Sequence, residues 1–559
     1  MKGAAINTML KLFKPSITYK VSKVRLITLG FAVTFPWVVL FWSTQHGRMA
    51  YSLGYDDVSY AVDSASRWNF FLNNSFIDVV SNLLVNPPHS PLSTFFGSLG
   101  FPFFGITDFG FYFGNAILFY LLVAVTYVIY AGLRFSYPEW VGDITVLVLI
   151  CSPFGFYVVH DSRPDMATGY LTILAAVGVF GQKLNPTRNY RNFVALTLGL
   201  ALVSKPPFIP HTFLMVALAF VLRWLVGSDR KGLRIGAKNF FDLALRTLVV
   251  SSPLLAIEFK PTLEYVIDNL FAKNKSVWTF PSEMSYVDII VEYLHPWWMY
   301  MGGLITPTSL VLAVLLILAL NKKVNPMLVF LTVLAASSLL FIAYLRYMNE
   351  YFFSSMHVAA VFMLPLVYFQ LQVIFKTRLQ NALRLGAAAV LCGLGLSVLN
   401  FAHYPAFPET NNTERNDKVI ASYLKSKDIS SLYLTFSGPI NQDNISWEST
   451  KLGHNLQMAN GTFETEVGKV VTQAKNYDTV LVPNLLSSTY NRALPSGAVQ
   501  GEVISRLLSD GFGEDMEFRK LGTRYHLLRK GASADGTVVV SVDGLAALSF
   551  NGQNPGASA

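Results

Sequence analysis

Residues 111–133 read FYFGNAILFYLLVAVTYVIYAGL, an apolar run without any Asp, Glu, Lys, Arg or His. About 20 apolar residues are enough to cross the hydrocarbon core of a bilayer as a helix, so this run is predicted to span a membrane. Runs of the same kind recur throughout residues 1–402, and residues 403–559 contain none. We predict about eleven spans, near residues 25–43, 111–133, 141–159, 166–181, 192–204, 208–226, 240–258, 299–320, 326–345, 357–375 and 385–402.

The composition agrees with a protein that crosses the membrane many times. Of the 559 residues, 52% are hydrophobic and only 14% are charged, against about 25% charged residues in an average soluble domain. The mean hydropathy is +0.42. These values exclude a disordered chain, a collagen and an ordinary cytosolic enzyme. The only two cysteines, Cys151 and Cys392, exclude a scaffold built on disulfides.

The distribution of charge along residues 1–402 orients the predicted spans. The segment before the first span and every second loop after it hold 21 basic and 4 acidic residues, whereas the other loops hold 8 basic and 14 acidic residues. Basic loops lie on the cytoplasmic side, so the N-terminus is predicted to be cytoplasmic and the acid-rich loops extracytoplasmic. The first run has no small-residue cleavage site and is predicted to be a retained anchor. The net charge of +9 is then a topology signal, and no nucleic-acid partner is expected.

Residues 403–540 are predicted to form a soluble extracytoplasmic domain. Helical and apolar extended patterns alternate along this segment, which indicates a small α/β module. The Gly-, Ala- and Ser-rich residues 541–559 are predicted to be a flexible tail. The expected fold class is a polytopic α-helical membrane protein with a C-terminal extracytoplasmic α/β domain. One helix and three strands are predicted in that domain, at Asn416–Ser426, Ser431–Phe436, Thr479–Val482 and Tyr525–Leu528.

The predicted first outer loop, about residues 44–110, carries adjacent carboxylates just after the first span. Asp56 and Asp57 could act as a general base, one accepting a proton while the other orients it or raises its pKa. A hydrated turn that caps a helix is the alternative interpretation. Further along the loop, residues 92–106 are too short to span and must not cross if the charge alternation is to hold. They are predicted to form a helix that lies in the membrane interface or dips in and out of it.

Three more charged clusters fall at span ends on the same predicted face. The turn at residues 160–166 contains Asp161, Arg163 and Asp165, which could orient a substrate or simply neutralise one another. Lys205 could bind a phosphate as a point charge, or extend its ammonium to the interface as an isolated lysine does. Arg346 could hold a phosphate with two hydrogen bonds, or sit in an aromatic belt beside a salt bridge.

The order of these motifs along the chain and their common side of the membrane resemble the pattern of the GT-C glycosyltransferases. Within that family, the pattern is similar to the branch of protein O-mannosyltransferases and lipid A aminoarabinose transferases. Members of that family have a cytoplasmic N-terminus, an acidic motif after the first helix and a Pro-Pro segment before interface helices. The departures are that the acidic pair is followed by Val58, Ser59 and Tyr60 without an Arg, and that Asn86 precedes the Pro-Pro pair while His89 follows it. The matching positions here are Asp56-Asp57, Pro87-Pro88, Asp161 or Asp165, Lys205 and Arg346-Tyr347.

The resemblance implies transfer of a sugar from a polyprenyl-phosphate donor to an acceptor hydroxyl on the extracytoplasmic face, with inversion. Asp57 or Asp56 would be the general base. The residues implied to orient donor or acceptor are Asp161, Asp165, His89 and Tyr60. The residues implied to bind the donor phosphate are Lys205, Arg346, Tyr347 and Arg163.

No cofactor is required by this set of residues, because Lys and Arg can stabilise a leaving phosphate. The carboxylates of Asp57, Asp161 and Asp165 would also suit Mg²⁺ or Mn²⁺, should the reaction use one. The expected partners are the lipid-linked donor, a glycan, lipid or protein acceptor, and the bilayer, with a bacterial inner membrane and its periplasmic face as the location. The alternatives are a ligase or polymerase of lipid-linked oligosaccharides, a transporter or flippase of an anionic or lipid-linked substrate, and a non-catalytic scaffold.

Overall fold

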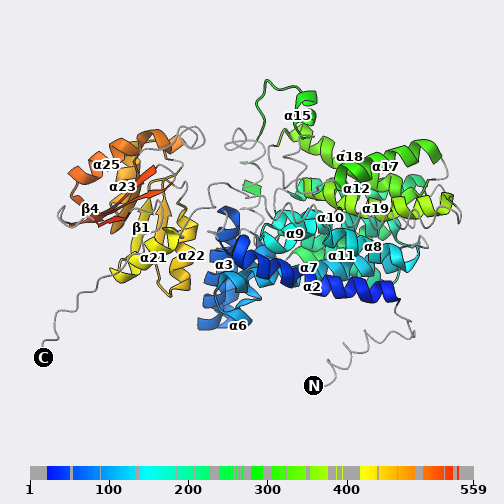
Figure 1. Cartoon of the computed structure of the whole chain (residues 1–559), viewed down its shortest axis with the longest axis horizontal. Coiled ribbons are helices and arrows are strands. Elements are labelled where there is room, and N and C mark those ends of the chain that lie inside the picture. The colour runs from blue at the N-terminus through cyan, green and yellow to red at the C-terminus, as the bar shows by residue number, and fades with distance from the viewer. Residues whose placement is uncertain are drawn as a thin grey trace, which may run out of the picture.

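The computed structural model shows a helical membrane domain joined to a separate domain built on a β-sheet (Figure 1). The predicted boundary at residues 402–403 and the predicted tail 541–559 lie outside the described residues. The structure describes residues 22–50, 55–88, 90–133, 137–183, 186–205, 208–226, 238–252, 255, 260, 263–264, 267, 279–293, 305–320, 324–347, 353–375, 386, 393, 416–436, 440–462, 464–484, 495–520, 523–532 and 538–540.

Long apolar helices make up the membrane domain. Ten of the eleven predicted spans overlap helices of the described residues, two of them only in part because residues 253–254, 256–258 and 299–304 are not described. The eleventh, 385–402, falls almost wholly outside the described residues. Of the helices in the described ranges, five are long and apolar enough to cross a membrane, and a bent pair would make six. The helices of this domain include α2 (Lys23–His46), α7 (Asp108–Gly132), α8 (Glu139–Ile150), α9 (Pro153–His160), α10 (Pro164–Gly181), α11 (Arg188–Ser204), α12 (Ile209–Val226), α17 (Ile305–Leu320), α18 (Pro326–Leu345) and α19 (Ser354–Ile374).

The span predicted at residues 141–159 is broken in the structure. Its two halves, α8 and α9, are bent by 65° at their junction. Pro153 begins α9 at the position where its missing N–H costs least, and the Ser152 side chain accepts a hydrogen bond from Gly155 N at 3.1 Å. A Cβ on Gly155 would lie 2.1 Å from the Leu149 carbonyl oxygen, so the sharp bend needs glycine there. The bend turns the end of α9 and residue 161 into the protein.

The first loop folds into four helices, α3 (Tyr55–Asn73), α4 (Phe76–Val85), α5 (Pro91–Ser98) and α6 (Phe101–Phe104). The apolar stretch 92–106 forms α5 and α6, two short helices that are not long enough to span, as expected. Backbone contact fixes α5 against α7, because a Cβ on Gly114 would lie 1.8 Å from the Phe96 carbonyl oxygen. This tight packing holds the first loop on the end of the membrane domain.

The C-terminal domain has a six-stranded mixed sheet in the order β2-β1-β3-β5-β4-β6. The first three strands of that order run parallel, and β5 is antiparallel to both β3 and β4. The helix predicted at Asn416–Ser426 is confirmed as α21, and the three predicted strands are confirmed as β1, β3 and β5. The strands are β1 (Ser431–Leu434), β2 (Gln457–Asn460), β3 (Thr479–Pro483), β4 (Phe512–Lys520), β5 (Thr523–Lys530) and β6 (Val538–Val540).

Helices cover both faces of this sheet. On one face, α21 and α22 (Gln442–Lys451) pack through Leu424 and Ile445 onto Leu432 and its neighbours. On the other, α23 (Val467–Ala474) and α25 (Gln500–Ser509) bury Val470 and Leu507. The predicted α/β module is therefore a three-layer sandwich.

Candidate functional site

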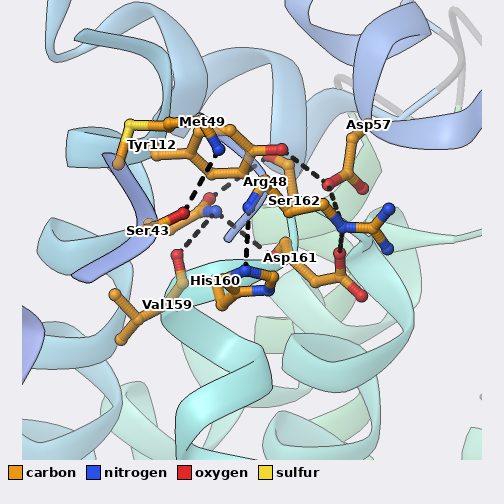
Figure 2. A network of polar contacts seen from close by, with 10 residues as sticks. Ser43, Arg48, Met49, Asp57, Tyr112, Val159, His160, Asp161 and Ser162 are labelled. Carbon is orange, nitrogen blue, oxygen red and sulfur yellow. Dashed lines mark hydrogen bonds and ion pairs between the residues drawn. The ribbon is translucent and has the colours of Figure 1, made fainter. Parts of the chain in front are cut away.

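Two buried carboxylates from separate elements face one guanidinium group. Arg48 Nε lies 3.0 Å from Asp161 Oδ1 and 3.9 Å from Asp57 Oδ2. Asp57 and Asp161 are only 1% and 2% exposed, and the Arg48 side chain is 12% exposed. Figure 2 shows the three side chains converging from α3, from the end of α9 and from the segment after α2. The structure thus brings together Asp57 and Asp161, one residue from each of the two predicted acidic clusters.

The backbone at Arg48 is fixed by the end of α2. Gly47 ends that helix, and a Cβ there would lie 2.6 Å from His160 Nε2 and 2.7 Å from Ser43 Oγ. The absence of a side chain lets Arg48 N donate to His160 Nε2 at 3.1 Å. His160 in turn stacks on Phe156, with 4.9 Å between ring centroids. Any other residue at position 47 would displace the segment that carries the guanidinium.

Helix α7 contacts the Asp57 carboxylate and the backbone of the turn that carries Asp161. The Tyr112 hydroxyl donates to Asp57 Oδ2 at 2.8 Å. One turn further along, Asn115 Nδ2 donates to the Asp161 carbonyl oxygen at 3.2 Å, and the Ser162 hydroxyl donates to Asn115 Oδ1 at 3.3 Å. The turn after α9 is therefore held to the same helix face as the Asp57 carboxylate.

The two carboxyl groups differ in acidity. Burial, and then the negative charge of Asp161, raise the pKa of Asp57 from its ordinary value of 3.8 to about 8. The guanidinium groups of Arg48 and Arg163 oppose this rise, as does the Tyr112 hydroxyl. Burial would raise the pKa of Asp161 as well, but the positive charges around it, chiefly Arg48, bring it below its ordinary value. Two carboxyl groups with pKa values this different can have different roles, because one can exchange a proton while the other stays ionised.

One oxygen of each carboxylate accepts no hydrogen bond from an N–H or from a Ser, Thr or Tyr hydroxyl of the described residues. These oxygens, Asp57 Oδ1 and Asp161 Oδ2, are buried, and the two carboxyl groups are close enough for protonated Asp57 to donate a hydrogen bond to Asp161. Buried polar oxygens are almost always satisfied, and exceptions call for an explanation such as a catalytic role or a bound ligand. A hydroxyl group that donated to Asp57 Oδ1 would satisfy it.

Lys205 and Asp165 form a second buried centre. Lys205 Nζ lies 2.7 Å from both oxygens of Asp165, and the two residues are 8% and 0% exposed. Ser354 at the start of α19 donates to the Asp165 carbonyl oxygen at 3.0 Å. The predicted role of Lys205 on a phosphate is not tested by this contact, but the lysine has a structural partner that the sequence did not indicate.

Arg346 and Tyr347 stabilise a different part of the chain. Arg346 ends α18 with a left-handed backbone, φ 56°. Its guanidinium donates to the carbonyl oxygens of Pro281 and Met284, the latter at 2.6 Å. The Tyr347 carbonyl oxygen accepts from the Tyr293 hydroxyl at 2.7 Å. These contacts hold the loop before α15 (Tyr286–Tyr293), and none of the contacts described for Arg346 reaches the Asp57 carboxylate.

The remaining predicted residues have mixed outcomes. Arg163 precedes α10 and is close enough to influence both Asp57 and Asp161. Tyr60 follows Asp57 on α3 and is buried in the core of the membrane domain. The side chain of Asp56 and the whole of His89 lie outside the described residues.

Two members of the site were not predicted from the sequence. Arg48 is the first basic residue after the first predicted span on the acid-rich side, and that position is the signal that could have identified it. Tyr112 lies inside the apolar run at 111–133, where a tyrosine is indistinguishable from a core aromatic. Their contacts depend on tertiary folding, because the Tyr112 and Asp57 partners are 55 residues apart.

The three-carboxylate metal set suggested by the sequence is not assembled. Asp57 and Asp161 face Arg48, whereas Asp165 is bound to Lys205. In the described part of the chain, one group of His, Asp and Glu side chains is close enough to share an ion, namely Glu514, Glu517 and His526 on β4 and β5. Glu514 Oε1 already lies 2.6 Å from His526 Nδ1, and Glu517 pairs with Arg524 at 3.1 Å. Use of Mg²⁺ or Mn²⁺ in the reaction stays a prediction.

Comparisons with known proteins bear on the fold. No protein-family model matches the sequence, and comparison with curated proteins gives no significant match. Two crystal structures of ArnT from Cupriavidus metallidurans are similar to this chain, with TM-scores of 0.53 for the apo state and 0.54 for the state bound to undecaprenyl phosphate. Each has 12% sequence identity and covers 90% of this chain and 98% of the ArnT chain. The chain thus has an ArnT-like fold, and the predicted fold class, a polytopic α-helical membrane protein with a C-terminal α/β domain, is confirmed.

Proposed function

We propose that this protein is a membrane glycosyltransferase that moves a sugar from a polyprenyl-phosphate donor to an acceptor hydroxyl, with inversion at the anomeric carbon. Asp57 is the general base. The acceptor O–H gives its proton to Asp57, the acceptor oxygen forms a bond to the anomeric carbon, and the bond from that carbon to the phosphate oxygen breaks. The polyprenyl phosphate leaves with the electron pair and stays in the bilayer.

The observation that carries this proposal is the pair of buried carboxylates on one arginine. Asp57 has a raised pKa, a buried oxygen that accepts no hydrogen bond from a described N–H or hydroxyl, and a tyrosine that fixes its other oxygen. Asp161 stays ionised on Arg48, and its negative charge helps to keep the pKa of Asp57 raised. General bases work best when their pKa lies near the operating pH. The arrangement therefore suits proton removal from a neutral hydroxyl.

The donor class is supported by the fold and by the basic groups near the site. One of the two similar ArnT structures is bound to undecaprenyl phosphate. In this chain, Arg163 and Lys205 are the proposed ligands of the leaving phosphate, since guanidinium and ammonium groups stabilise the charge that develops on it. We also retain Arg346 and Tyr347 as proposed donor ligands, although their described contacts are structural.

The proposed orientation places the N-terminus in the cytoplasm and the site with the C-terminal domain on the other side, in a bacterial inner membrane. Arg25 meets Glu139 and Asp143 at 3.2 Å, so three residues predicted to lie at the cytoplasmic end are in contact. Arg48, Asp57 and Asp161, which are all predicted to face outward, meet in a separate cluster. This separation agrees with the alternation of basic and acidic loops.

A donor assay tests the proposal. The full chain, purified and reconstituted in lipid, is incubated with polyprenyl-phosphate sugars labelled in the sugar, and release of label to acceptor or water is measured. We expect turnover with at least one monophosphate donor. Turnover only with diphosphate-linked oligosaccharides would favour a ligase or polymerase. Movement of an intact lipid-linked sugar across the bilayer without cleavage would favour a flippase.

The pH dependence of turnover follows from the acidity of Asp57. Because the base must be ionised, kcat/KM is expected to fall about tenfold per pH unit below about 8. Asp161→Asn removes the neighbouring negative charge, so the midpoint of the profile should move to lower pH. The measurement is initial rate against pH for both proteins. A midpoint that stays fixed in Asp161→Asn would contradict the assignment of Asp57 as the titrating base.

Lys205 can be tested apart from its structural partner. Lys205→Met alone leaves Asp165 buried without its cation and is expected to destabilise the fold. In the double variant Lys205→Met/Asp165→Asn, the buried charge is gone, so the protein should fold. We expect donor binding weaker by about ten- to a hundredfold, the loss of one charge-assisted contact. Wild-type donor affinity in the folded double variant would show that Lys205 only neutralises Asp165.

A further inference from the structure

Helix α22 of the C-terminal domain inserts a tryptophan into the membrane domain. Trp447 is 1% exposed, and it belongs to the hydrophobic core of the membrane domain, not to either core of the sheet. Its ring centroid lies 6.2 Å from that of Phe111 on α7. Helix α22 also packs against α3, which carries Asp57, and Figure 1 shows the two helices adjacent where the domains meet.

The first turn of α7 is anchored by charge as well as by packing. Asp108 Oδ1 accepts from Trp447 Nε1 at 2.6 Å and from Lys451 Nζ at 3.1 Å. Lys451 also lies 2.7 Å from Glu448, whose side chain is 7% exposed. A carboxylate in the first turn is favoured by the helix dipole, so Asp108 joins α22 to α7 without disturbing the helix that it begins.

This anchor lies one helical turn from the proposed base. Asp108 and Tyr112 are four residues apart on α7 and therefore share a face, and Tyr112 donates to Asp57 at 2.8 Å. The intervening turn has little room to adjust, because a Cβ on Gly97 of α5 would lie 2.5 Å from the Phe111 ring and one on Gly110 would lie 2.4 Å from a backbone oxygen. Closely packed elements transmit displacement instead of absorbing it.

We infer that the C-terminal domain positions the catalytic base: Trp447 and Lys451 hold Asp108, and thereby keep Tyr112 of α7 in place on Asp57. Both are positioning residues, since neither touches the reacting groups. The catalytic part of this inference rests on the proposed function. The contact of α22 with α7, and its effect on the position of Tyr112, do not depend on the proposed function.

Three variants weaken this link at separate atoms. Trp447→Phe keeps a ring but removes the N–H donor, Lys451→Met keeps the aliphatic stem but removes the charge, and Asp108→Asn removes the acceptor charge. The matched control is Lys469→Met, because Lys469 forms a pair of the same i, i+3 spacing with Glu466 on the exposed surface of the same domain. A double-mutant cycle of Lys451→Met with Asp108→Asn shows whether the two residues act on each other.

The first readout is the kinetics of the reconstituted full chain. We expect kcat lower by about ten- to a hundredfold, as for a small misplacement of a catalytic group, with KM for the donor unchanged. Because the Tyr112 hydrogen bond lowers the pKa of Asp57, its loss should also move the pH midpoint upward. A variant that only reduced the amount of folded protein would lower the rate at every pH and leave the pH midpoint unchanged. Wild-type kcat and midpoint in folded Trp447→Phe and Lys451→Met, with the wild type active, would overturn the inference.

The second readout is hydrogen exchange, which is independent of any donor. Peptides covering residues 55–73 and 108–116 should exchange faster in Trp447→Phe and Lys451→Met than in the wild type, and not in Lys469→Met. If the wild type turns over no donor, the proposed function fails, and this readout alone decides the inference. Unchanged exchange in both peptides would then refute it, and faster exchange would support the link.

Discussion

Asp57→Asn should reduce turnover by about 10²–10⁴-fold, the usual contribution of a general base. Asparagine has nearly the same shape and can still accept the Tyr112 hydrogen bond, so the change removes basicity and little else. KM for the lipid-linked donor should change little, because Asp57 is proposed to contact the acceptor. The measurement is release of labelled sugar from the polyprenyl-phosphate donor, with single-turnover kinetics to isolate the chemical step.

The matched control is Asp63→Asn on the same helix. Asp63 accepts from Arg67 at 2.8 Å and from the Thr94 hydroxyl at 2.7 Å, away from the arginine at the site. This variant should keep turnover within a few fold of the wild type. Loss of turnover in Asp161→Asn with full turnover in Asp57→Asn would exchange the roles of the two carboxylates. Wild-type turnover in both would exclude this site as the source of the base.

The same substitution should stabilise the protein in a pH-dependent way. The pKa of Asp57 is raised on folding, from 3.8 to about 8, so the folded state holds its proton more tightly and stability is lost as pH rises between those values. The asparagine amide that replaces this carboxyl does not titrate. The apparent melting temperature of the variant should therefore exceed that of the wild type by an amount that grows from pH 4 to pH 8. A constant difference would contradict the raised pKa.

The fold was largely predictable because apolar run length and turn chemistry are local. The run at 111–133 became α7 almost to its ends, and the run at 326–345 became α18. The 141–159 run was predicted as one span and is two helices bent by 65°. Hydropathy averaged over a window does not report the direction of the helix axis. A break at Ser152-Pro153 inside a continuous apolar segment therefore leaves the average unchanged.

The site was predictable only in part because its contacts join distant segments. Sidedness alone placed Asp56, Asp57, Asp161 and Asp165 on the acid-rich face, but it did not show that Asp57 pairs with Asp161 while Asp165 binds Lys205. Lys205 has no acidic residue near it in sequence, and its partner Asp165 is 40 residues away. Arg48 follows the first span on the acid-rich side, where the positive-inside rule does not expect a basic residue, but its contact with both carboxylates became visible only in the tertiary structure.

Arg48→Met should destabilise the protein by about 3–5 kcal/mol near pH 8, because it leaves buried carboxylates without their cation. The Arg48 guanidinium lies close to both Asp57 and Asp161, at 3.9 and 3.0 Å. Loss of this charge also favours the protonated form of Asp57, so any surviving turnover should have a pH midpoint above about 8. The measurement is apparent melting temperature in detergent across pH 5 to 9, with turnover measured on the folded fraction.

Rescue variants separate charge from shape. Arg48→Lys keeps the charge but loses the planar fork, so it should recover much of the stability and less of the turnover. Arg48→Met/Asp161→Asn removes one buried charge along with its partner and should melt closer to the wild type. Arg67→Met, which breaks the more exposed pair with Asp63, should cost about 1 kcal/mol or less. If Arg48→Met melted like Arg67→Met, the arginine would not be holding the carboxylates together. Water would then have to reach the carboxylates, and the burial that raises the pKa of Asp57 would be smaller than the structure indicates.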